Sequence, residues 1–132
     1  IVLPKMVEAG GGRVINIASD AARVGSSGEA VYAACKAGLL GLSKTLAREL
    51  ASKNVTLNVV CPGPTDTALL KGVAETSRDP EKLLEVFRNA VPMRRIGRPE
   101  DYPGIITMLA SDEASFITGQ VISVSGGLTM AG

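Results

Sequence analysis

Three short apolar segments, separated from one another by sequence of helical character, most constrain the fold of this chain. They cover residues 14–18, 55–61 and 120–125. A long helical segment from Glu29 to Ser52 separates the first two, and a second one from Arg98 to Ser111 precedes the third. Strands that alternate with helices and are apolar on both faces are typical of a parallel sheet covered by helices. The sequence therefore predicts an α/β fold with three parallel strands and flanking helices.

The long helix is predicted to bury one stripe of leucines against the sheet. Four leucines recur at helical spacing and form this stripe, namely Leu39, Leu42, Leu46 and Leu50. Residues 1–9 are predicted to be the end of another helix, which the glycines at 10–12 end.

The other segments are assigned from turn and capping signals. Residues 20–28 are predicted to form a Gly- and Ser-rich loop, and residues 65–98 to be the least regular part of the chain. Within that part, Asp79 as N-cap predicts a short helix over residues 80–89. Pro103 conflicts with the helix predicted around it, because proline removes an early backbone hydrogen bond.

Composition and charge exclude several classes of function. The chain has 132 residues, a net charge of +1 and 3% aromatic residues, whereas nucleic-acid binding favours clustered basic side chains with aromatic residues for stacking. No apolar run approaches the ~18 residues of a membrane span. The chain has no histidine, which excludes Ser-His-Asp catalysis and disfavours a zinc site. We expect one globular domain with no nucleic-acid, membrane or metal partner, and its Cys35 and Cys61 as reduced thiols in the cytoplasm.

Three side chains form a complete set for proton transfer at a carbonyl or an alcohol. Tyr32 and Lys36 are four residues apart, so they share one face of a helix, and Ser19 follows the first strand. A nearby cation lowers the pKa of a phenol, so Lys36 would let Tyr32 exchange a proton with a substrate oxygen while Ser19 donates a hydrogen bond to it. The alternative is that Tyr32 and Lys36 are an ordinary exposed pair on a helix. A tyrosine and a lysine at this spacing, taken without other motifs, favour this alternative.

Further motifs favour the proton-transfer interpretation over the exposed pair. They are Asn16-Ile17-Ala18-Ser19, Tyr32 to Lys36, Asn58 to Thr67 with its Pro62-Gly63-Pro64 turn, Arg98-Pro99-Glu100-Asp101, Ile117 to Gln120, and Gly126-Gly127. Together and in this order they resemble the short-chain dehydrogenase/reductase family over nearly the whole chain. Within the family, residues 16–36 and 125–130 look most similar to 2-hydroxycyclohexanecarboxyl-CoA dehydrogenases and to enzymes like the 3-oxoacyl-ACP reductases.

The resemblance implies a role for each matching residue. Ser19 would polarise the substrate carbonyl, Tyr32 would be the general acid/base, and Lys36 would assist Tyr32 and bind the nicotinamide ribose. The implied cofactor is NAD or NADP, with NAD slightly favoured, and it would carry the hydride between a secondary alcohol and a ketone. The implied cofactor-binding residues are Tyr32, Lys36, Pro62, Gly63, Thr65 and Thr67.

The resemblance also implies that part of the family's domain is missing here. A Gly-rich turn that places a pyrophosphate at a helix N-terminus is absent from the sequence. We therefore expect residues 1–132 to be a single partial domain, the C-terminal half of a Rossmann-like doubly wound dehydrogenase, with an open edge on its first strand. The alternative is a non-catalytic truncated fragment or oligomerisation module of such an enzyme.

The expected partners follow from the same resemblance. They are a small alcohol or ketone, with an acyl-CoA-linked substrate as one option, and further copies of the chain in a homo-oligomeric dimer or tetramer. Five basic residues could contact a CoA phosphate or simply form a solvated basic surface; they are Lys71, Arg78, Lys82, Arg94 and Arg95.

Overall fold

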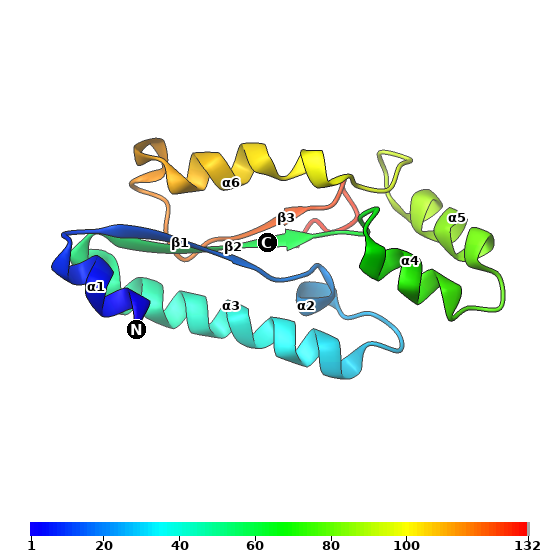
Figure 1. Ribbon diagram of the computed structural model, residues 1–132, viewed down its shortest axis with the longest axis horizontal. Helices are drawn as coiled ribbons and strands as arrows, with labels where there is room; N and C mark the ends of the chain where they lie inside the picture. The colour runs from blue at the N-terminus through cyan, green and yellow to red at the C-terminus, as the bar shows by residue number, and fades with distance from the viewer. Residues whose placement is uncertain (132) are drawn as a thin grey trace.

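The computed structural model describes residues 1–131, and its central element is a three-stranded parallel sheet. The strands β1 (Gly12–Ile17), β2 (Val55–Pro62) and β3 (Val121–Val124) lie in the order β1-β2-β3. Helices cover both faces (Figure 1). The α/β fold with three parallel strands and flanking helices is therefore confirmed, and each strand lies within two residues of its predicted position.

The helices form a layer on either side of the sheet. Figure 1 shows α1 (Val2–Glu8), α2 (Ala21–Val24) and α3 (Ala30–Leu50) on one face and α6 (Pro103–Ala110) on the other. The helices α4 and α5 lie beyond the end of the sheet toward which the strands run. The bounds of the remaining elements are α4 Ala68–Glu75, α5 Pro80–Ala90, and the 3₁₀ segments η1 Ala51–Lys53, η2 Pro99–Asp101 and η3 Asp112–Ala114.

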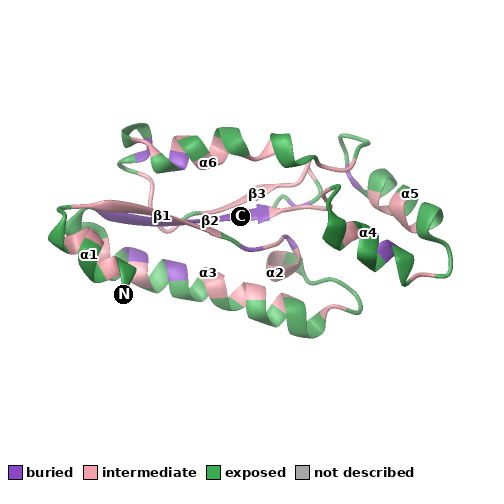
Figure 2. Ribbon diagram, in the orientation of Figure 1, coloured by how far each residue is buried: buried purple, intermediate pink, exposed green. Residues whose placement is uncertain are grey.

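The central strand β2 forms the core of the molecule. It is buried from Val55 to Cys61, and Figure 2 shows it in the colour of buried residues between the two helical layers. Alternate side chains point to opposite faces of a strand. Val55, Leu57, Val59 and Cys61 accordingly belong to the clusters packed by α1, α2 and α3, and Val60 belongs to the cluster with Leu109 and Ala114 of the α6 layer.

The buried face of α3 differs from the predicted leucine stripe. Leu42 is 52% exposed, so its assignment to the core was wrong. The fully buried positions of α3 are Ser43 and Ala47, two small residues that allow the helix to approach the sheet. The Ser43 hydroxyl also accepts a hydrogen bond of 2.8 Å from the Asn16 side-chain amide of β1. Leu39, Leu46 and Leu50 are half-buried and pack on the core as expected.

Two short helices outside the sheet were also missed. Residues 21–24, predicted to be loop, form α2, and residues 68–75 form α4, whose N-cap Thr67 accepts a hydrogen bond from the Leu70 amide at 3.3 Å. The conflict expected at Pro103 does not arise, because α6 begins at this residue, where the missing amide has no helical partner to lose.

None of the helices within residues 1–131 has both the length and the hydropathy to cross a bilayer.

Candidate active site

The carboxyl ends of the three strands meet at one edge of the sheet, and Ser19 lies at this edge. The ladder between β1 and β2 continues past Ile17, because the Ala18 amide donates to the Val60 carbonyl at 2.8 Å and the Asp20 amide donates to the Pro62 carbonyl at 3.0 Å. Ser19 is thus fixed between two backbone hydrogen bonds.

The Ser19 hydroxyl is available to donate to a ligand. Its oxygen accepts a hydrogen bond of 3.2 Å from the Ala21 amide at the start of α2. A hydroxyl that accepts one bond keeps its own proton for donation. The side chain is half-buried, so it is held by the protein and still reaches solvent.

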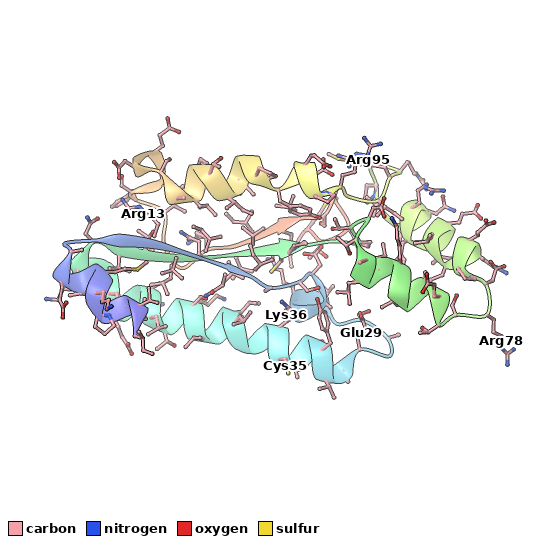
Figure 3. All side chains as sticks on the ribbon, viewed as in Figure 1. Arg13, Glu29, Cys35, Lys36, Arg78 and Arg95 are labelled. Carbon is pink, nitrogen blue, oxygen red and sulfur yellow. The ribbon has the colours of Figure 1, made fainter. Side chains whose placement is uncertain are left out.

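Tyr32 and Lys36 lie on the first turns of α3, and Lys36 is hydrogen-bonded to the end of β1. The Lys36 ammonium donates a hydrogen bond of 3.0 Å to the Ile17 carbonyl and lies 5.9 Å from the centroid of the Tyr32 ring. Figure 3 shows Lys36 on the sheet side of α3 and Cys35 on the opposite side. Tyr32 is 36% exposed. The structure therefore places Tyr32 and Lys36 next to each other and attaches Lys36 to the carbonyl two residues before Ser19.

The turn after β2 holds the predicted cofactor-binding residues close to β3. The Gly63 amide donates to the Val124 carbonyl at 3.1 Å. A Cβ atom on Gly63 would lie 2.8 Å from the Ser125 Cβ and 2.9 Å from its Cα, which is closer than real side chains approach. Glycine at position 63 is therefore required by the packing of the turn itself.

The two threonines of this turn are engaged within the protein. The Thr65 hydroxyl donates to the Gly63 carbonyl at 2.8 Å and shares a hydrogen bond with the Tyr102 hydroxyl. Thr67 caps α4, and its side chain is exposed. Pro62 at the end of β2 contributes its carbonyl to the Asp20 amide. These side chains shape the turn, and Thr67 lies farther along it than the others.

Three polar residues beside Ser19 were missed by the sequence reasoning. Asp20 is 5% exposed, and its carboxylate accepts a hydrogen bond of 2.5 Å from the Ser123 hydroxyl. Arg23 of α2 donates to the same hydroxyl oxygen at 2.9 Å and to the Ala131 carbonyl. The signal that could have revealed them is an acidic residue directly after a strand-end serine, with a basic residue three positions later.

Burial also changes the chemistry of the neighbouring thiol. The pKa of Cys61 is raised above its ordinary value, first because the thiol is desolvated and second because the Asp20 carboxylate is close. Cys61 therefore stays a neutral thiol and is a poor nucleophile. Among residues 1–131, no group of three His, Cys, Asp or Glu side chains could hold a metal ion.

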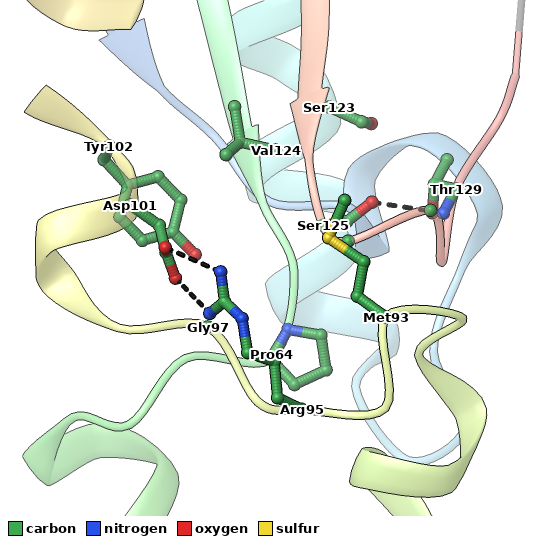
Figure 4. A pocket seen from close by; sticks show the side chains of 12 residues that line it. Pro64, Met93, Arg95, Gly97, Asp101, Tyr102, Ser123, Val124, Ser125 and Thr129 are labelled. Carbon is green, nitrogen blue, oxygen red and sulfur yellow. Dashed lines mark hydrogen bonds and ion pairs between the residues drawn. The ribbon is translucent and has the colours of Figure 1, made fainter. Parts of the chain in front are cut away.

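A cavity of about 440 Å³ lies next to the turn, and Ser123 lines it, whereas Ser19, Tyr32 and Lys36 do not. Figure 4 shows Pro64, Tyr102, Ser125 and Thr129 among its lining residues. Its basic side chain, Arg95, forms two hydrogen bonds of 2.6 and 2.8 Å with the Asp101 carboxylate.

The ion pair between Arg95 and Asp101 changes the interpretation of the basic residues. Arg95 is a pairing partner within the protein, and Lys71 likewise pairs with Asp66 at 3.0 Å. The pKa of Asp101 is lowered to about 2, most strongly by the hydrogen bonds from the Arg95 side chain and next by the hydrogen bond from the Arg98 amide.

Comparisons with known proteins identify relatives of this chain. A family model described as Enoyl-(Acyl carrier protein) reductase matches residues 1–129. The chain is 40% identical over 130 residues, 98% of its length, to the 3-oxoacyl-[acyl-carrier-protein] reductase FabG of Thermotoga maritima, and this match covers 50% of the relative. It is 44% identical over 117 residues, 88% of its length, to the acetoacetyl-CoA reductase of Shinella zoogloeoides, covering 46% of that protein. The chain thus spans about half the length of the curated relatives it matches.

Proposed function

We propose that the intact protein is an NAD(P)-dependent oxidoreductase that interconverts a secondary alcohol and a ketone, because this chain belongs to the short-chain dehydrogenase/reductase family. The observation that carries the proposal is the position of Lys36. Its ammonium is 3.0 Å from the Ile17 carbonyl and 5.9 Å from the Tyr32 ring centroid. In an ordinary exposed helical pair, the lysine would have no such hydrogen bond to the strand end that precedes Ser19.

The proton would move at the Tyr32 hydroxyl. In the direction of ketone reduction, Tyr32 donates its proton to the substrate oxygen, and in alcohol oxidation it accepts one. The Lys36 ammonium lies beside this phenol, 5.9 Å from the centroid of its ring. Ser19, whose oxygen is oriented by the Ala21 amide at 3.2 Å, donates a hydrogen bond to the same substrate oxygen as negative charge develops on it.

The residues at the sheet edge also fit a nicotinamide nucleotide. An ammonium has three N–H donors, and Lys36 uses one of them on Ile17, which leaves two for the ribose hydroxyls. Tyr32 is exposed beside it, and the turn of Pro62, Gly63, Thr65 and Thr67 follows the adjacent strand. When bound, the nicotinamide supplies the hydride chemistry. The choice between NAD and NADP depends on residues that contact the adenosine end, and NAD is slightly favoured.

We further propose that residues 1–132 act as the C-terminal half of this enzyme. The half-length coverage of the relatives supports this assignment. In addition, β1 pairs with β2 alone among residues 1–131, so its other edge can accept a further strand. That further part of the protein would complete the pyrophosphate and adenosine site.

The proposed substrate is a ketone or alcohol carried on an acyl thioester. Relatives at 40% and 44% identity are named as reductases of 3-oxoacyl-acyl carrier protein and of acetoacetyl-CoA. We propose that a 3-oxoacyl group, linked to CoA or to acyl carrier protein, meets Ser19 and Tyr32. Acetoacetyl-CoA is accordingly the first substrate to test.

The intact enzyme is proposed to be a cytoplasmic homo-oligomer. Large apolar side chains such as Leu42, 52% exposed, and Phe116, 103% exposed, lie on the surface of this chain, and such side chains are suited to burial between subunits. Cys35 and Cys61 are free thiols, as in a reducing compartment. Light scattering of the intact protein would give the number of subunits.

The test uses the intact protein, acetoacetyl-CoA and reduced NAD or NADP, with nicotinamide absorbance as the readout. Tyr32→Phe keeps the ring and removes the proton donor, so turnover should fall by about 10² or more, while cofactor binding stays measurable by calorimetry. Cys35→Ala, on the opposite side of α3, is the matched control and should keep wild-type turnover. Unchanged turnover in Tyr32→Phe would refute the mechanism. A wild-type protein inactive with ketones and alcohols would favour the non-catalytic assembly module instead.

A further inference from the structure

A hydrogen-bonded group of side chains crosses the sheet directly beside Ser19. Asp20 follows β1 and Ser123 belongs to β3, so their 2.5 Å hydrogen bond passes over the central strand β2 at Cys61, the residue that pairs with Ser123. Arg23 of α2 donates to the same Ser123 hydroxyl at 2.9 Å. We call Asp20, Ser123 and Arg23 the polar clasp.

The Ser123 hydroxyl links an anion to a cation. It donates to the Asp20 carboxylate and accepts from the Arg23 guanidinium. Asp20 is 5% exposed, and its second oxygen has no hydrogen-bond partner among residues 1–131. A buried carboxylate is costly unless it is paired and hydrogen-bonded. The Ser123 hydroxyl is therefore the one hydrogen-bond donor to this carboxylate among residues 1–131, and Asp20 would move if this hydroxyl were lost.

Movement of Asp20 would reach Ser19 through the backbone. The Asp20 amide donates to the Pro62 carbonyl at 3.0 Å, and its carbonyl accepts from the Arg23 amide at 2.9 Å in the first turn of α2. The next amide, that of Ala21, orients the Ser19 hydroxyl. The polar clasp thus fixes the turn that points the Ser19 hydroxyl.

We propose that Ser123, Asp20 and Arg23 are positioning residues for Ser19, so that the last strand of the sheet sets the geometry of a catalytic hydroxyl on the first. Arg23 also donates to the carbonyl of Ala131, so the clasp extends to the C-terminal segment. The proposal rests on the proposed function for its effect on turnover, and on the structure alone for its effect on the turn.

The first readout is hydrogen exchange of residues 18–25 in the intact protein, which does not require activity. Ser123→Ala leaves a buried carboxylate without its donor, so exchange of this segment should become about tenfold faster. Ser123→Thr keeps the hydroxyl and should restore slow exchange. Ser111→Ala removes a comparable hydroxyl, which donates to the Met108 carbonyl at 2.8 Å at the end of α6, and should leave residues 18–25 unchanged.

The second readout is turnover with acetoacetyl-CoA. Ser123→Ala should lower kcat by about tenfold with the cofactor Kd unchanged, and Ser123→Thr should recover it. Faster exchange with unchanged kcat, or unchanged exchange in a folded Ser123→Ala protein, would overturn the positioning role. If Ser123→Ala does not fold, Arg23→Met must both speed the exchange of residues 18–25 and lower kcat. Arg23→Lys must then show smaller changes in both quantities. A wild-type protein without activity would refute the proposed function, while the exchange comparison would still decide whether the clasp holds this segment.

Discussion

Replacement of Gly63 by alanine should destabilise the protein through a collision with the adjacent strand end. The new Cβ would lie 2.8 Å from the Ser125 Cβ and 2.9 Å from the Ser125 Cα. The second of these atoms belongs to the backbone and cannot rotate away. Overpacking of this kind costs about 1–3 kcal/mol of unfolding free energy. Because the Gly63 amide also donates to Val124 at 3.1 Å, the strain would act on the pairing between β2 and β3.

Urea denaturation of the intact protein, followed by circular dichroism, measures this cost. The matched control is Gly72→Ala in α4, where a new Cβ meets no heavy atom within 4 Å. An alanine in a helix interior is favoured over glycine by about 1 kcal/mol, so this variant should be slightly more stable than wild type. The two glycine substitutions thus have opposite predicted signs.

A double-mutant cycle identifies the colliding atoms. Ser125→Gly removes the Cβ at 2.8 Å but leaves the Cα at 2.9 Å. In the Ser125→Gly background, Gly63→Ala should therefore cost less than in wild type, without becoming free of cost. Equal costs in both backgrounds would show that the Ser125 Cβ is not the obstacle. A Gly63→Ala protein as stable as wild type would refute the packing argument altogether.

Two further predictions concern parts of the fold outside the site. Leu109→Ala removes a side chain that is 0% exposed in the α6 layer and should lower the unfolding free energy by about 2–5 kcal/mol, measured by the same denaturation. The pKa of Asp101 is about 2 in the folded protein against an ordinary 3.8, chiefly because Arg95 donates to it. Because the unfolded chain takes up this proton first, the stabilisation is present above pH 3.8 and is lost as the pH falls toward 2. Asp101→Asn should remove that part of the acid dependence, and an unchanged acid transition would contradict it.

The backbone arrangement was largely predictable because β2 has an unmistakable sequence pattern. Residues 55–61 are five apolar residues with Thr56 and Asn58 between them, and the structure buries every one of the seven. Because the strands are parallel, the segments that follow β1, β2 and β3 all lie at the same edge of the sheet. The position of Ser19 at this edge follows from this topology and needs no side-chain information.

Side-chain detail was less predictable where several periodicities compete. On α3, leucines at 39, 42, 46 and 50 suggested one stripe, but the helix turns Leu42 outward and buries Ser43. A small residue that lets a helix approach a sheet has no hydrophobic signal of its own. The short helix α2 was missed for a similar reason, because its residues 21–24 complete less than two helical turns and their order depends on tertiary hydrogen bonds such as that of Arg23 to Ser123.

The contacts divide the predicted site residues into two groups with different functions. Ser19 and Lys36 keep donors that no atom in residues 1–131 uses, and Tyr32 is 36% exposed, so under the proposed function these three would act on ligands. Gly63 and the Thr65 hydroxyl are consumed by the turn, through the close approach of Ser125 and the bonds to Gly63 and Tyr102. Gly63 and Thr65 therefore shape the turn, and under the proposed function the backbone of the turn would contact the cofactor. A substitution in the first group should lower kcat in a stable protein, whereas one in the second group should lower stability together with cofactor affinity.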